Sequence, residues 1–151
     1  MPKAADIAKA MKLAERLCRE RGVRLTPQRR EVLAAINSSD RPLGAYDIME
    51  QLRADQPRIA PPTVYRALDF LMAEHLIHKL ESLHAYIGCR HPDHPHFSQF
   101  LICNACGEVD ELHNDGVSHS LSDAAQARGF EPDHSTVEVQ GRCARCLQTG
   151  H

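Results

Sequence analysis

The chain has 151 residues, of which 42% are apolar and 25% are charged, and its formal net charge is −2. These values are typical of a globular protein with one ordinary domain or two small ones. No apolar run approaches the ~20 residues that a membrane-spanning helix needs, and the first residues lack the pattern of a secretory signal. We therefore expect a cytoplasmic protein with no membrane partner.

Charge and potential metal ligands are divided unequally along the chain. Residues 1–83 hold 14 Lys and Arg against 11 Asp and Glu, a balance of +3, whereas residues 84–151 hold 4 against 9, a balance of −5. All ten histidines lie from His75 onward, and five of the six cysteines lie from Cys89 onward. The sequence therefore predicts a basic unit at 1–83 and an acidic, ligand-rich unit at 96–151, joined by a hinge at 84–95.

The first unit is predicted to be mainly helical. Apolar residues recur at helical spacing in four segments, at residues 7–17, 32–36, 48–52 and 64–72. Thr26-Pro27 supplies an N-cap and a proline at the first position of the second helix. Pro61-Pro62-Thr63 opens the fourth helix in a similar way. The loosely alternating segments LIHKLES and HAYIGC then predict a β-hairpin.

Short helices followed by a hairpin are the pattern of a winged helix-turn-helix domain, in which the helix after the turn enters the major groove of DNA. Here that helix begins PPTVYRALDF. Arg66 can bind O6 and N7 of guanine, and Thr63 and Tyr65 can donate hydrogen bonds to phosphates. The alternative is that Tyr65 packs at the surface and Arg66 is a solvated charge, because many helical domains share this pattern.

The second unit is predicted to be α/β. FSQFLIC and GEVDELH have the length and composition of short strands, residues 118–128 form a helix that Gly129 ends, and FEPDHSTVEVQGRC contains a further strand. A small sheet with one helix buries little apolar surface. We therefore expect a metal site or a partner subunit to stabilise this unit.

Two Cys-x-x-Cys pairs lie in the second unit, with 36 residues between them; they are Cys103 with Cys106, and Cys143 with Cys146. Each pair follows a predicted strand, so that a turn can direct both sulfurs to one point. Four thiolates around one ion form a closed, tetrahedral zinc site with a structural role. A redox dithiol and two unrelated pairs are the alternatives.

A second set of possible ligands lies around the predicted hairpin, hinge and first strands. One thiolate, two imidazoles and one carboxylate also suit tetrahedral zinc. This set is His78, Cys89, His96 and Glu111. Composition alone leaves the assignment open, because other histidines compete for the same role: His84, His91, His94 and His113.

Several segments carry a family resemblance: RLTPQRREVLAAI, AYDIMEQL, PPTVYRALDFLMAEHLIHKLES, CNACGEVDEL and GRCARC. In order and spacing they resemble the ferric uptake regulator family, from about Leu13 to Cys146. Within that family the chain is most similar to the zinc uptake regulator branch, and PPTVYRALDFL is the segment that points to zinc rather than iron.

The resemblance implies an α+β homodimer with an N-terminal winged helix-turn-helix domain and a small C-terminal α/β dimerisation domain. It implies two Zn²⁺ per protomer: a structural ion on the four cysteines and a regulatory ion on His78, Cys89, His96 and Glu111. It places DNA contacts at Tyr46 and Arg66, with Tyr65 nearby. The function implied is a zinc-responsive repressor that binds AT-rich palindromic operators of zinc-uptake genes and has no small-molecule substrate.

Two other classes of function are compatible with parts of the sequence. One is a regulator of the same family that responds to iron, manganese or peroxide, although a thiolate ligand argues for zinc because harder ions prefer oxygen and nitrogen. The other is a zinc enzyme with Glu111 as general base. The chain lacks both HExxH and the deaminase signature that such enzymes carry. We therefore expect a regulator and not an enzyme.

Overall fold

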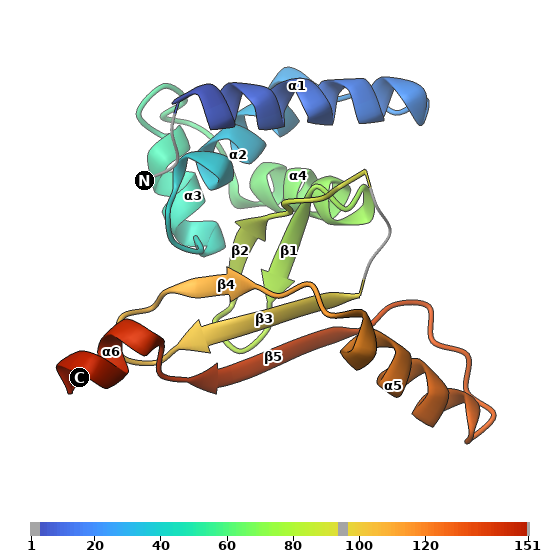
Figure 1. The fold of residues 1–151 in the computed structure, drawn as a ribbon. Helices are drawn as coiled ribbons and strands as arrows, with labels where there is room; N and C mark the ends of the chain where they lie inside the picture. Colours follow the sequence, from blue (N-terminus) through green and yellow to red (C-terminus); the bar gives the residue numbers. More distant parts are fainter. Residues whose placement is uncertain (1–3, 94–96, 151) are drawn as a thin grey trace. The chain divides into compact units, whose positions relative to one another are not determined.

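The computed structural model describes residues 4–93 and 97–150. The chain divides into two compact units, Met1–His94 and Pro95–His151 (Figure 1). The predicted limits of the hinge, residues 84 and 95, stay a prediction. Within the described ranges, every helix is too short or too polar to cross a lipid bilayer.

Within residues 4–93, four helices and a hairpin form the first unit. Their bounds are α1 Ala4–Glu20, α2 Pro27–Ser38, α3 Ala45–Leu52, α4 Pro61–Ala73, β1 Ile77–Leu80 and β2 Ala85–Gly88. Oγ1 of Thr26 accepts a hydrogen bond from the backbone N–H of Arg29 at 3.3 Å, and this N-cap fixes the start of α2. Pro61 and Pro62 lack an N–H, which costs little in the first turn of a helix. The four predicted helices and the hairpin are confirmed.

The apolar faces of the four helices pack into one core. Its least exposed side chains are Cys18, Val32, Leu33, Ile48, Val64, Leu68 and Leu71. The guanidinium of Arg29 also lies 3.8 Å from the ring centroid of Phe70, and this cation–π contact joins α2 to α4. Because one face of α4 is buried in this core, its other face is held in a fixed orientation.

The hairpin is attached to the helices through Leu43. Strands β1 and β2 pair in antiparallel fashion with Leu80 opposite Ala85. Tyr86 of β2 exchanges two backbone hydrogen bonds with Leu43, at N···O distances of 2.7 and 3.0 Å. Leu43 directly precedes Gly44, the N-cap of α3. The order α2, α3, α4 and hairpin is a winged helix-turn-helix, as predicted.

In its described residues, the second unit is a three-stranded sheet with two helices (Figure 1). Its elements are β3 Ser98–Cys103, β4 Val109–Glu111, α5 Asp115–Gln126, β5 Thr136–Gly141 and α6 Ala144–Thr149. The strand order is β4-β3-β5, with β3 antiparallel to β4 and parallel to β5. The α+β class is confirmed, and α6 is an element that the sequence did not predict.

The apolar core of the second unit is small. Among its described residues the buried apolar side chains are Phe100, Ile102, Cys103 and Cys146. Helix α5 has no buried residue between Asp115 and Gln126, and its Leu121 is 43% exposed. Two of the four buried side chains are cysteines, so the packing of this unit depends directly on what the thiols bind.

Candidate metal centres and nucleic-acid interface

The sheet register brings the two Cys-x-x-Cys turns together. Strands β3 and β5 are parallel and end opposite each other, with Cys103 paired to Gly141. The backbone N–H of Asn104 donates to the carbonyl of Gly141 at 2.8 Å, which joins the two turns. Gly107 closes the first turn at φ +78°, a conformation that favours glycine. Both pairs therefore leave the same edge of the sheet.

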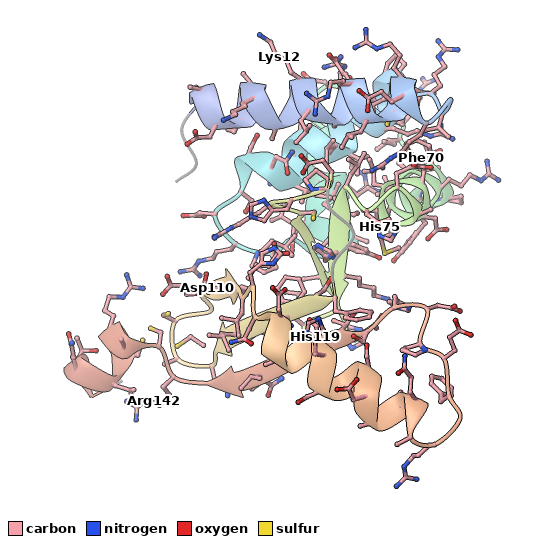
Figure 2. The ribbon with its side chains drawn as sticks, turned by 45° about the vertical axis from the view of Figure 1, so that its right-hand side comes forward. Lys12, Phe70, His75, Asp110, His119 and Arg142 are labelled. Carbon is pink, nitrogen blue, oxygen red and sulfur yellow. The ribbon has the colours of Figure 1, made fainter. Side chains whose placement is uncertain are left out.

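The four sulfur atoms form a compact cluster. The Sγ atoms of Cys103, Cys106, Cys143 and Cys146 all lie within 4.8 Å of one another, and those of Cys106 and Cys143 are 3.8 Å apart. A tetrahedron with Zn–S bonds of about 2.3 Å requires sulfur atoms about 3.8 Å apart. Figure 2 shows sulfur atoms gathered close to α6 and the labelled Arg142. None of the six cysteines forms a disulfide, and these four fit a closed zinc site.

The surroundings of the cluster bias some of its thiols toward the thiolate. The backbone N–H of Cys143 donates to Sγ of Cys103 at 3.3 Å. This bond, with others from the amides of Cys106 and Ala105, lowers the pKa of the Cys103 thiol to about 6. A hydrogen bond with the side chain of Cys143, together with burial, raises the pKa of the Cys146 thiol to about 12. Because one thiol resists deprotonation, a bound dication is needed to hold all four sulfurs as thiolates.

Arg145 supplies a positive charge beside the cluster. Its Nη2 lies 3.6 Å from Sγ of Cys106 and 3.7 Å from a carboxylate oxygen of Glu108. Four thiolates and one Zn²⁺ carry a net charge of −2, which a guanidinium partly offsets. Sequence reasoning missed Arg145, because nothing in the local sequence indicates a contact across 39 positions.

Two of the four predicted regulatory ligands lie together in the first unit. His78 is on β1 opposite Ile87, and Cys89 directly follows β2. The N–H of Cys89 donates to the carbonyl of Leu76 at 3.0 Å, which extends the hairpin pairing by one residue. A ring nitrogen of His78 and Sγ of Cys89 lie within 4.8 Å of each other, and both residues are half-buried. The pair can offer a metal ion one imidazole and one thiolate.

The other two predicted ligands belong to the second unit. Glu111 is half-buried on β4 of the second unit, opposite Phe100 of β3. His96 lies outside the described residues, as does the competing His94. The competing side chains of His84, His91 and His113 are exposed. The complete set of four regulatory ligands therefore stays a prediction.

The predicted DNA-contacting residues are exposed on the winged helix-turn-helix. Tyr65 and Arg66 lie in the first turns of α4, and Tyr65 is 51% exposed. Thr63 is also exposed, and Tyr46, the second residue of α3, is 67% exposed. Exposed tyrosines at the N-terminal ends of two packed helices leave hydroxyls available for DNA. DNA contact by these residues stays a prediction.

Comparison with known proteins gives concordant matches. The model of the ferric uptake regulator family matches residues 20–140. The zinc uptake regulation protein of Escherichia coli (strain K12) is 43% identical over 136 residues, which are 89% of this chain and 80% of that protein. The peroxide operon regulator of Bacillus subtilis (strain 168) is 31% identical over 142 residues, 92% of this chain and 94% of that protein. A solved zinc uptake regulator complexed with zinc and DNA is 41% identical with a TM-score of 0.90, covering 95% of this chain and 97% of its own.

Proposed function

The chain belongs to the ferric uptake regulator family, and from this premise we propose that it is a zinc-responsive transcriptional repressor of zinc-uptake genes. The observation that carries the choice of zinc is the thiol of Cys89 beside the imidazole of His78. A thiolate ligand favours zinc over iron and manganese, which prefer oxygen and nitrogen. The higher identity to a zinc uptake regulation protein than to a peroxide operon regulator, 43% against 31%, supports the same choice.

The proposal assigns two Zn²⁺ to each protomer. The structural ion would be held by the four cysteines, whose sulfur separations suit it. The regulatory ion would be held by His78, Cys89, His96 and Glu111, a set that rests on the family resemblance. Zinc binding itself is supported by the relative that was solved with zinc and DNA.

The DNA-binding surface in this proposal is the exposed N-terminal end of α4 with the start of α3. Arg66 would bind guanine in the major groove, Tyr46 would make a second contact, and Thr63 and Tyr65 would donate to phosphates. A winged helix-turn-helix dimer binds two half-sites related by its own two-fold axis. The operator is therefore expected to be palindromic, and the family resemblance makes it AT-rich.

We assign homodimer formation to the second unit. The outward side chains of its sheet include Leu101, 40% exposed, and Val139, 51% exposed, and the loop after α5 carries Phe130 at 64%. Exposed apolar side chains on a unit with a small core favour burial against a second copy. The dimer would act in the cytoplasm, where its DNA lies.

The proposed regulation depends on which unit supplies each regulatory ligand. His78 and Cys89 belong to the first unit and Glu111 to the second, so shared ligation would restrict the angle between the two. If only 1% of the metal-free dimers had the competent angle, apparent DNA affinity would fall about a hundredfold, or about 2.7 kcal/mol. By linkage, operator DNA would tighten regulatory zinc binding by the same factor.

Fluorescence anisotropy tests this proposal directly. Chelator-treated protein that retains its structural zinc is titrated onto a labelled AT-rich palindromic duplex while buffered free zinc is raised. We expect steep binding with zinc that iron and manganese do not reproduce. Binding that is independent of zinc, or that manganese or iron supports equally well, would contradict a zinc-specific sensor.

A further inference from the structure

Arg21 connects the segment that follows Cys89 to the C-terminal end of α4, the helix proposed to contact DNA. Arg21 comes directly after α1. Its Nη1 donates to the carbonyl of Glu74 at 2.6 Å, and its Nη2 donates to the carbonyl of Pro92 at 3.0 Å. The same Nη1 lies 3.5 Å from a carboxylate oxygen of Glu74, which is the C-cap of α4. One guanidinium thus joins three segments that are distant in sequence.

The segment from Cys89 to Pro92 is consequently held at both ends. At its start, the N–H of Cys89 donates to the carbonyl of Leu76 at 3.0 Å. At its end, Pro92 accepts the hydrogen bond of Arg21. The two carbonyl groups that accept these hydrogen bonds from Arg21 and Cys89 belong to Glu74 and Leu76. They flank His75, labelled in Figure 2, where the chain leaves α4 with φ +57°. The backbone that carries the Cys89 thiol therefore has little freedom to move away from His78.

We propose that Arg21 is a positioning residue for the regulatory metal site. It holds the Cys89–Pro92 segment so that the thiol of Cys89 lies beside the imidazole of His78 before the metal binds. A preorganised ligand loses less conformational freedom on binding, so the zinc affinity rises. The inference rests on the proposed function, and it concerns Arg21 itself, which is not one of the proposed ligands.

Arginine is suited to this role in a way that lysine is not. The planar guanidinium presents several N–H donors in a fixed fork, and here two of its nitrogens serve two different carbonyl groups. A lysine ammonium at this position keeps the charge beside Glu74 but offers one compact donor group. Arg21→Lys therefore separates the bridging geometry from the charge. Arg19, exposed on the last turn of α1, provides a matched control of the same charge.

The test uses full-length protein with its structural zinc loaded, in the wild type and in Arg21→Ala, Arg21→Lys and Arg19→Ala. Zinc affinity of the regulatory site is measured by competition with a chromophoric chelator. Cobalt substitution reports the Cys89 thiolate through its sulfur-to-cobalt charge-transfer absorption. We expect about tenfold weaker metal binding in Arg21→Ala, an intermediate loss in Arg21→Lys and no change in Arg19→Ala. Structural zinc content and DNA affinity at saturating zinc should stay at the wild-type value.

The possible results distinguish the positioning role of Arg21 from the proposed zinc-sensing function on which it rests. Unchanged metal affinity in Arg21→Ala, or an equal loss in Arg19→Ala, would overturn the positioning role. A lowered melting temperature without a change in metal affinity would assign Arg21 to fold stability only and would also overturn it. If Arg21→Ala does not fold, Arg21→Lys decides by the same criteria. A Cys89→Ser variant that binds as much zinc as the wild type would instead refute the proposed regulatory site itself.

Discussion

Replacing Cys103 by serine should unfold the second unit and leave the first unit folded. Cys103 ends β3, is 4% exposed, and accepts the hydrogen bond of the Cys143 amide that joins the two Cys-x-x-Cys turns. A serine hydroxyl is a poor zinc ligand, because it does not form the soft anionic donor that a thiolate does. The variant should therefore lose the structural ion that we assign to the four cysteines.

The expected loss of stability follows from the size of the apolar core in each unit. Apart from the cysteines, the buried apolar side chains in the described part of the second unit are Phe100 and Ile102. Burying each contributes about 1.5–3 kcal/mol. A structural zinc site contributes about 10–16 kcal/mol in small zinc-binding domains at pH 7. Loss of the ion thus exceeds the stabilisation from these two side chains, whereas the first unit keeps a core built from four helices.

Hydrogen exchange read by mass spectrometry, with zinc content and mass measured on the same samples, tests this expectation. Peptides from residues 97–150 should exchange rapidly in Cys103→Ser, peptides from α2 and α4 should stay protected, and the dimer should dissociate. Cys89→Ser is the matched control, because it removes a thiol outside the four-cysteine cluster. A Cys103→Ser protein that is dimeric, protected in both units and fully loaded with structural zinc would refute the reasoning.

Four further substitutions give separate tests. Cys89→Ser should keep the structural zinc and the dimer but abolish zinc-dependent anisotropy changes; a normal zinc response would remove Cys89 from the sensor. Arg66→Ala should lose ~1–3 kcal/mol of discrimination between operator and random duplex, and equal weakening on both would mark Arg66 as a phosphate contact. Thr26→Ala removes the side-chain N-cap of α2 and should lower the free energy of unfolding of the first unit by ~1 kcal/mol in urea titrations. Leu68→Ala, at a fully buried position, should lower it by ~2–5 kcal/mol, and a cost below that of Thr26→Ala would contradict the core assignment.

Elements with local signals were predictable from the sequence. The proline at position 27 and the pair Pro61-Pro62 mark helix starts that the structure places at the same residues. The reason is that proline fits the first turn of a helix and disrupts its interior. Apolar periodicity identified core-facing residues in the four helices of the first unit, because burial follows the 3.6-residue repeat. The two Cys-x-x-Cys pairs were also recognisable from local sequence, because the two cysteines of each pair lie within one turn of the chain.

Features that depend on distant contacts were not predictable. Helix α6 covers only Ala144–Thr149 and has no room for a periodic apolar pattern. The strands of the second unit were identified, but the parallel pairing of β3 with β5 is decided by the connection through α5. The Leu43–Tyr86 bridge and the contacts of Arg21 join residues more than 40 positions apart. Such contacts leave no mark in the neighbouring sequence, and the register between β3 and β5 is what aligns the four sulfurs.

The difference in core size explains why this chain would use one metal site for structure and another for sensing. A metal ion that stabilises a unit with a small core cannot leave without unfolding that unit, so the four-cysteine site is unsuited to reversible signalling. The pair His78 and Cys89 lies on a hairpin that Leu43, Leu76 and the helical core already hold in place. Metal bound at this proposed site would be able to leave while the first unit stays folded. We therefore infer that removing the ligand thiol of Cys89 changes the response to zinc, whereas removing that of Cys103 changes the fold.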